Sequence, residues 1–148
     1  MDNLFKSDSY RDLVVKNNYN TIEFLLKAGK DFGIVAYTDF INFNPEIPKS
    51  VIEFEKFALF MIAGYSKESA VLNNESFSFE AGFGESNFGS HLTIPLEAIV
   101  QIVVGEDIIA VSYYEPQKRI EPKNSMDLLL NNPENQTLLK KLKKGKKG

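Results

Sequence analysis

The stretch from Phe77 to Val104, FSFEAGFGESNFGSHLTIPLEAIVQIVV, constrains the possible fold more than any other part of the chain. In its first half, phenylalanine or alanine occupies every second position, with serine, glutamate or glycine between them. Successive side chains of a β-strand point to opposite faces, so this alternation predicts a strand with one apolar face. Glycines at positions 82, 84 and 89 then interrupt the pattern, and apolar residues resume on both sides of Pro95.

The glycine cluster could belong to a phosphate-binding loop or to a hairpin. A dinucleotide-binding loop would need a further glycine at position 87 and a helix directly after it. Asn87 occupies that position, and the residues that follow, SHLTIPLEAI, are typical of a strand. The sequence therefore favours a wide β-hairpin, in which glycine allows a positive φ or a close approach of two backbones.

The N-terminal part of the chain predicts a helix. Residues 9–28 carry apolar side chains at helical spacing, and Gly29 is a natural helix stop. The Asn17-Asn18 pair weakens the middle of this segment, so the pattern fits either one helix or two shorter ones.

Between and beyond these elements the chain reads as a series of short strands. The expected strands are GIVAYTDF from Gly33, a buried strand over 56–66 that ends at Gly64, SFSFEAGF, two strands around Pro95, and EDIIAVSYYE after Gly105. The proline-containing FNPEIPKSVIEF reads as a loop or broken edge, and KESAVLNN fits a helical turn or a loop. About five or six strands behind one helix predict a mainly β fold, a small β-barrel or sandwich with a helical lid.

Charge divides the chain into two parts. Residues 1–116 hold 8 Lys and Arg against 17 Asp and Glu, a net charge of −9. Residues 117–148 hold 9 against 3, a net charge of +6, and end in the lysine run KKLKKGKKG. We expect one folded domain over 1–116, followed by a flexible linker and basic tail over 117–148.

Several classes of chemistry are disfavoured by composition. The chain has no cysteine and a single histidine, His91, which we expect to be held by a neighbouring hydrogen bond. The acidic pairs Glu53/Glu55, Glu106/Asp107 and Glu23/Asp31 are expected on a solvated surface. We therefore predict no catalytic residues, no metal site and no cofactor. With no apolar run of membrane-spanning length and no signal-peptide pattern, we expect a cytoplasmic protein.

The order of motifs carries more information than composition. IVAYTDF, FALFMIAG, AVLNNESFSFEAGFG and HLTIPLEAIVQIVV follow one another in a sequence that resembles the SspB (stringent starvation protein B-like) family, over roughly residues 9–116. The matching positions are Phe79, Phe83, Gly84, Ile94, Pro95, Ala98 and Ile99. One departure is Glu85, which stands where the family has a second glycine.

This resemblance implies a compact Sm-like β-barrel and a homodimer formed through the N-terminal helix. It implies a non-enzymatic adaptor of the ClpXP protease that binds ssrA-type peptide tags. The peptide-binding residues implied by position are Ile62, Ala63, Gly64, Phe79, Ala81, Phe83 and Gly84. The tail segment implied to dock on the N-terminal domain of ClpX is Leu138, Leu139, Lys140, Lys141, Leu142 and Lys143.

Two other functions stay open at this point. An Sm-like RNA-binding protein would use the barrel and the lysine-rich tail, although a domain at −9 repels phosphate and makes nucleic-acid binding the weaker hypothesis. A small enzyme is disfavoured, since the sequence offers no spare histidine, no cysteine and no acid pair in an apolar setting.

Overall fold

The computed structural model describes residues 3–117. The chain divides into two units, residues 1–116 and 117–148. The helical elements are η1 (Leu4–Lys6), α1 (Asp8–Lys27), η2 (Thr38–Phe40), α2 (Tyr65–Glu68) and η3 (Leu96–Ala98). The strands are β1 (Phe32–Tyr37), β2 (Asn42–Asn44), β3 (Phe57–Ile62), β4 (Val71–Leu72), β5 (Ser76–Phe83), β6 (Phe88–Pro95), β7 (Ile99–Val104) and β8 (Asp107–Val111).

The predicted N-terminal helix is confirmed as a single helix, α1. It begins after Ser7, whose hydroxyl accepts a hydrogen bond from the Tyr10 N–H at 3.2 Å. It ends before Gly29, which has a φ of +68° and donates its N–H to the Leu26 carbonyl. The asparagine pair does not break the helix, because Asn18 is buried and bonds to the rest of the domain.

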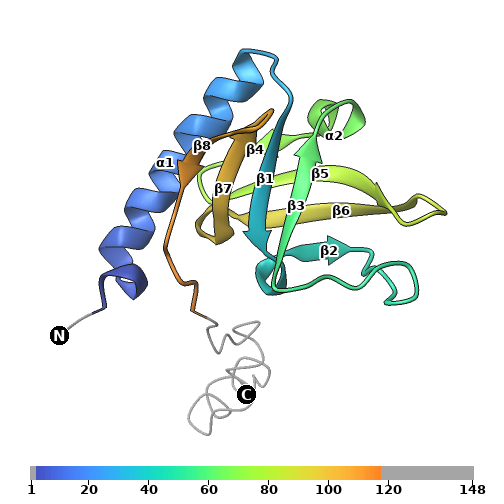
Figure 1. Cartoon of the computed structure of the whole chain (residues 1–148), viewed down its shortest axis with the longest axis horizontal. Helices are drawn as coiled ribbons and strands as arrows, with labels where there is room; N and C mark the ends of the chain where they lie inside the picture. Colours follow the sequence, from blue (N-terminus) through green and yellow to red (C-terminus); the bar gives the residue numbers. More distant parts are fainter. Residues whose placement is uncertain (1–2, 118–148) are drawn as a thin grey trace, which may run out of the picture. The chain divides into compact units, whose positions relative to one another are not determined.

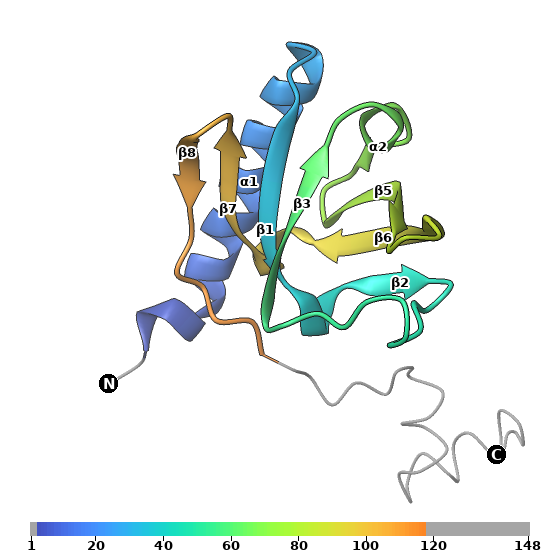
Figure 2. The ribbon, with the colours of Figure 1, turned by 45° about the vertical axis from the view of Figure 1, so that its right-hand side comes forward.

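The strands form two antiparallel sheets of four strands each. The first sheet has the order β3-β1-β7-β8 and the second the order β2-β6-β5-β4. Strands of one sheet run across those of the other, and α1 lies beside β7 and β8 (Figures 1 and 2). The prediction of a mainly β fold with an N-terminal helix is confirmed. Within residues 3–117 no strand pairing joins the two sheets, so the β structure is not a closed barrel.

The alternating segment forms the hairpin that the sequence predicts. β5 and β6 pair from Ser76↔Pro95 to Phe83↔Phe88. In the turn between them, Gly84 has a φ of +73° and Asn87 a φ of +55°. Asparagine tolerates this conformation better than most residues, so Asn87 serves the turn where a phosphate loop would need glycine. A strand follows the turn, and the hairpin prediction is confirmed.

The core lies between the two sheets and is closed by α1. Its fully buried side chains come from β1, β5, β6 and the helix, among them Phe32, Phe77, Leu92 and Ile22. Burying such side chains supplies about 1.5–3 kcal/mol each relative to an exposed position. The core therefore accounts for the alternation that marks these strands in the sequence.

The prediction of a buried strand over 56–66 that ends at Gly64 is right about the strand but wrong about its end and about the burial of one face. β3 ends at Ile62, and only every second side chain, Phe60 and Ile62, faces the core. Phe57, Leu59 and Met61 are 42%, 55% and 54% exposed on the outer face. The reason is topological, since β3 is an edge strand with one face on the core and one toward solvent.

Two further features differ in detail from the expectation. Residues 3–117 form eight strands rather than five or six, because the short β2 and β4 extend the second sheet on either side of the hairpin. KESAVLNN begins with the end of the single-turn helix α2, as one of its two alternatives predicts, and then forms the short strand β4, which neither alternative predicts. No helix within residues 3–117 is long and apolar enough to span a membrane.

Candidate functional site

The first component of the candidate site is the open edge of β3. β3 pairs with β1 alone among the described strands. The Thr38 N–H donates to the Lys56 carbonyl, so by the alternation of antiparallel ladders the backbone groups of Phe57, Leu59 and Met61 point away from β1. The Met61 carbonyl accepts a hydrogen bond from the Ser66 hydroxyl at 3.1 Å, which fits this direction. The backbone of Phe57 and Leu59 is thus available to a further strand.

The second component is the half of β5 that β4 does not cover. β4 pairs only with Phe77 and Ser78 of β5. Beyond that point, the Glu80 N–H donates to the Ser69 hydroxyl at 2.9 Å, so the backbone groups of Glu80 point away from β6. The same alternation directs the backbone N–H and carbonyl of Gly82 outward. The end of β5 from Phe79 to Phe83 therefore presents a second, partly open edge.

Aromatic rings bridge these two edges. The Phe60 ring of β3 lies 6.2 Å from Phe79 and 6.4 Å from Phe83, measured between ring centroids. Phe54 packs edge-on against Phe83 at 5.8 Å and stacks on Phe43 at 5.2 Å. We call the edges of β3 (Phe57–Ile62) and β5 (Phe79–Phe83), with the rings between them, the β3–β5 site. The two strands meet here through side chains rather than through a hydrogen-bond ladder.

Burial divides the residues of this site into two groups. Ile62 and Phe79 are fully buried, whereas Ala81 and Phe83 are half-buried and pack against the core from its rim. A half-buried ring with a small neighbour can form the wall of a pocket for a side chain of a ligand. The β3–β5 site therefore has the components of a surface that takes up an extended peptide.

The binding residues predicted from the sequence lie in three different places: in the core, in the segment after β3 and at the rim of the site. Ile62 and Phe79 lie in the core, so they support the site from below and do not reach a ligand. Ala63 and Gly64 follow β3, where the Ser66 hydroxyl accepts from the Ala63 N–H at 2.9 Å. Ala81, Phe83 and Gly84 lie at the rim: the first two half-buried, the third exposed in the hairpin turn.

Gly84 is fixed by its neighbours as well as by its φ. A Cβ added there would lie 2.7 Å from the Val51 side chain and 3.2 Å from the Val51 carbonyl oxygen. The hairpin turn thus packs directly on the loop that carries Val51 and Phe54. Glu85, the departure from the family pattern, is exposed in the same turn.

Sequence reasoning missed Phe43 and Phe54, which complete the aromatic part of the site. Both belong to FNPEIPKSVIEF, the segment predicted to be a loop or a broken edge. The available signal was two phenylalanines, with three further aliphatic residues, in a segment predicted to be a loop, because exposed loops rarely carry so many large apolar side chains. Their shared partner Phe83 comes from β5, a strand distant in the sequence.

The electrostatic environment at the start of β3 is mixed. The Lys56 ammonium lies 5.8 Å from the centre of the Tyr37 ring and 5.6 Å from that of Phe57. Burial raises the pKa of the Tyr37 hydroxyl, and the negative charge of Glu115 raises it further. One end of β3 therefore carries a cation held over aromatic rings.

His91 is paired, as expected. Its Nδ1 lies 2.9 Å from a carboxylate oxygen of Glu80, the residue opposite it in the β5–β6 ladder. In the part of the chain that the structure describes, no cluster of three or more His, Cys, Asp or Glu side chains could hold a metal ion.

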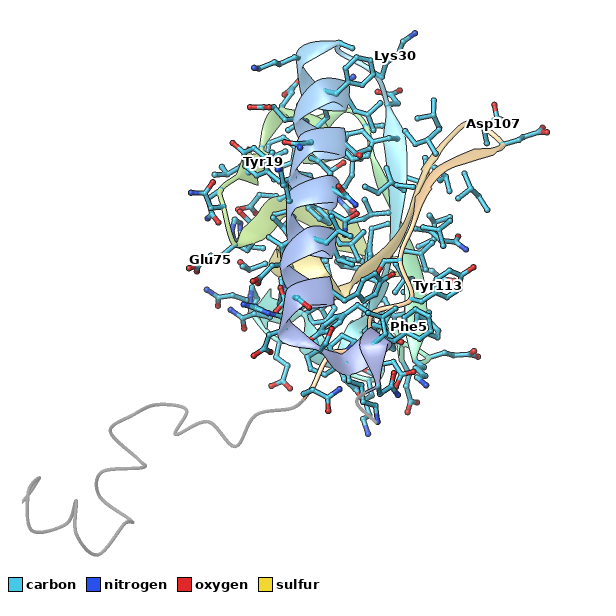
Figure 3. The ribbon with its side chains drawn as sticks, turned by 90° about the vertical axis from the view of Figure 1, so that its left-hand side faces the viewer. Phe5, Tyr19, Lys30, Glu75, Asp107 and Tyr113 are labelled. Atoms are coloured by element: carbon cyan, nitrogen blue, oxygen red, sulfur yellow. The ribbon has the colours of Figure 1, made fainter. Side chains whose placement is uncertain are left out.

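The predicted dimerisation helix presents a mixed face to solvent (Figure 3). Leu13 and Phe24 are 51% and 67% exposed, among charged and amide side chains. The N-terminal end of α1 is tied to the end of the domain, since the Tyr113 N–H donates to the Tyr10 hydroxyl and the Phe5 ring lies 5.8 Å from that of Tyr113. The predicted ClpX-docking residues, 138–143, lie outside the described residues.

Comparison with known proteins adds no assignment. No protein-family model matches the chain, and no curated protein matches it.

Proposed function

We propose that this chain is a non-enzymatic, cytoplasmic proteolysis adaptor of the SspB type, with a two-sheet body related to the Sm-like barrel. It binds ssrA-type peptide tags at the β3–β5 site and tethers the tagged protein to ClpX through its C-terminal segment. The observation that carries the proposal is the open edge of β3 beside the partly open end of β5, with half-buried rings between them. The motif order in the sequence is the second support.

The geometry suits an unstructured peptide. An extended chain added to β3 would receive main-chain hydrogen bonds from Phe57 and Leu59. Its alternate side chains would then face the rings of Phe54 and Phe83, beside the small Ala81. Main-chain pairing supplies affinity and the pockets for alternate side chains supply selectivity, so binding needs no catalytic group.

Fluorescence anisotropy with a labelled ssrA-type peptide is the direct test. We expect saturable binding by the full chain and at least about a tenfold weaker signal with a scrambled peptide of the same composition. Equal binding of both peptides, or of neither, would remove the tag-binding function. A salt-sensitive complex between residues 1–117 and RNA, with no peptide binding, would favour the RNA-binding alternative instead.

The tether is tested separately. In a pull-down with the isolated ClpX N-terminal domain, we expect the full chain to bind and a chain that ends at Gln136 not to bind. Only the full chain has the leucine–lysine segment 138–143. A flexible tether raises the effective concentration of cargo at the protease toward about millimolar. Retention of both chains would place the docking segment elsewhere, while peptide binding by the shortened chain should not change.

Dimerisation through α1 completes the proposal. Its support is the exposed pair Leu13 and Phe24 on the outer face of the helix. Sedimentation equilibrium of the full chain should give a dimer, which Phe24→Glu should convert to a monomer. An unchanged mass would assign the contact to another surface.

A further inference from the structure

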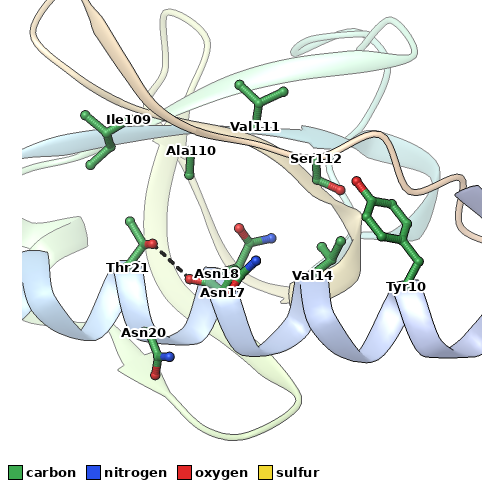
Figure 4. Close-up of a pocket in the computed structure, with 10 residues that line it drawn as sticks. All are labelled: Tyr10, Val14, Asn17, Asn18, Asn20, Thr21, Ile109, Ala110, Val111 and Ser112. Carbon is green, nitrogen blue, oxygen red and sulfur yellow. Dashed lines mark hydrogen bonds between the residues drawn. The ribbon is translucent and has the colours of Figure 1, made fainter.

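A cavity of about 330 Å³ lies between α1 and β8, on the far side of the first sheet from the β3–β5 site (Figure 4). β3 and β8 are the two edges of this sheet, so the cavity belongs to the opposite edge from the proposed tag site. Ten residues line it, and none of them carries a charge at neutral pH. The cavity therefore suits a neutral ligand.

On the strand side, the cavity lies against the backbone of β8. Four consecutive residues, 109–112, line it. Ala110 and Ser112 point toward α1 and Val111 points away from it (Figure 4), so β8 borders the cavity with the side chains of one face and with the backbone between them. Ile109 and Val111 are exposed, while Ala110 packs against the core and Ser112 is buried.

The direction of the ladder identifies the backbone groups that face this edge. The Ser112 N–H donates to the Val100 carbonyl of the neighbouring strand at 2.8 Å. In an antiparallel ladder the next residue points the other way, so the N–H and carbonyl of Val111 are directed away from β7. Within residues 3–117 neither group has a hydrogen-bond partner. β8 thus offers one unpaired donor and one unpaired acceptor at the cavity.

On the helix side, the lining is polar and uncharged. Val14, Asn17 and Thr21 are spaced three and four residues apart, so they follow one face of α1, and Asn18 lies beside them. The Thr21 hydroxyl donates to the Asn17 carbonyl at 2.8 Å, as the dashed line in Figure 4 marks. The Asn17 side-chain amide is exposed and, among the described residues, unpaired. It can therefore both donate to and accept from a ligand.

On the outer face of β8, two apolar side chains lie next to the groove. Ile109 and Val111 are exposed, and Val111 points away from α1 (Figure 4). The arrangement is an edge strand beside a helix, with amides on the helix side and exposed apolar side chains on the outer face of the strand.

We propose that the groove between α1 and β8 is a second peptide-binding site that takes an extended segment of another protein as a fifth strand beside β8. The segment pairs with the Val111 N–H and carbonyl. On the side that faces α1, it places a neutral polar side chain, such as asparagine, glutamine, serine or threonine, against the Asn17 amide. On the opposite side, it places apolar side chains beside Ile109 and Val111. Strand addition beside a helix is a recurrent way of binding peptides, and the neutral lining selects against charged side chains.

The test uses the full chain labelled with ¹⁵N and a nine-residue peptide, acetylated and amidated, in which valine alternates with asparagine and threonine. We expect dose-dependent shifts of the Ile109 and Val111 backbone amides and of the Asn17 side-chain amide. The signals of Phe79, Ala81 and Phe83 should not move. Because the two sites lie at opposite sheet edges, this outcome is independent of whether ssrA-type peptides bind at the β3–β5 site.

Two variants distinguish strand addition from nonspecific binding. Val111→Pro removes the outward N–H without removing a bond to β7, so it should weaken binding about tenfold while the domain remains folded. Asn17→Trp fills the mouth of the groove and should abolish the shifts. Lys16→Trp, one position earlier and not in the lining, is its matched control and should bind as the parent does.

Three results would overturn the proposal. The first is shifts confined to the β3–β5 site. The second is binding that survives Asn17→Trp. The third is concentration-dependent self-association that Val111→Pro abolishes without any peptide present, since a second copy of the chain would then be the occupant of the β8 edge. Should Val111→Pro fail to fold, the comparison of Asn17→Trp with Lys16→Trp still tests whether the peptide binds in the groove.

Discussion

Ala81→Gln is expected to abolish peptide binding at the β3–β5 site. Ala81 lies half-buried between Phe79 and Phe83 on the inner face of β5, where its small side chain leaves room beside the rings. Glutamine at this position would occupy the space that the peptide needs, so we expect affinity to fall by at least about a hundredfold through steric exclusion. Fluorescence anisotropy with the ssrA-type peptide measures the change.

The matched control is Ser78→Gln, the same side chain on the opposite face of the same strand. It should bind as the parent does, and both variants should unfold near the parent temperature. Unchanged affinity of Ala81→Gln would show that the site is misplaced. If this variant is unstable, Leu59→Pro gives a second test, because it removes an outward N–H from the edge of β3 and leaves the pairing with β1 in place.

Asn18→Ala is expected to have the largest effect on stability. The Asn18 side-chain amide donates to the carbonyls of Leu96 and Ile99, at 2.8 Å and 3.0 Å, and thereby joins α1 to η3 and the start of β7. Losing the shared donor leaves buried acceptors unpaired, which costs about 3 kcal/mol. For a domain of this size, that loss lowers the midpoint of thermal unfolding by roughly 10 °C.

The neighbouring Asn17→Ala is the control, because the Asn17 side chain is exposed and makes no such bonds. Its midpoint should stay within about 2 °C of the parent, as for most surface substitutions. Asn18→Asp should be at least as destabilising as Asn18→Ala, since its carboxylate would face two carbonyl oxygens. Equal stability of Asn18→Ala and the parent, measured by calorimetry, would show that the two bonds do not fasten the helix to the sheets.

The open edge of β3 could not be predicted from its sequence. FALFMI is apolar at every position, so the pattern is the same for a strand buried on both faces and for an edge strand with an apolar outer face. Which case holds depends on the neighbours that the topology supplies. The same applies to Asn18, whose polar side chain argues against burial until its two carbonyl partners, 78 and 81 residues away, are in place.

Local patterns determined much of the rest. The sequence by itself determined a helical N-terminal segment with its end near Gly29, the β5–β6 hairpin and the common face of Phe77 and Phe79, because capping, turn geometry and side-chain alternation act over a few residues. Only the tertiary structure decided the separation into two sheets and the burial of Ile62. It also brought together Phe43, Phe54, Phe60 and Phe83, and it left the edges of β3 and β8 open. Those features depend on contacts between strands far apart in the chain, and no short-range pattern in the sequence records them.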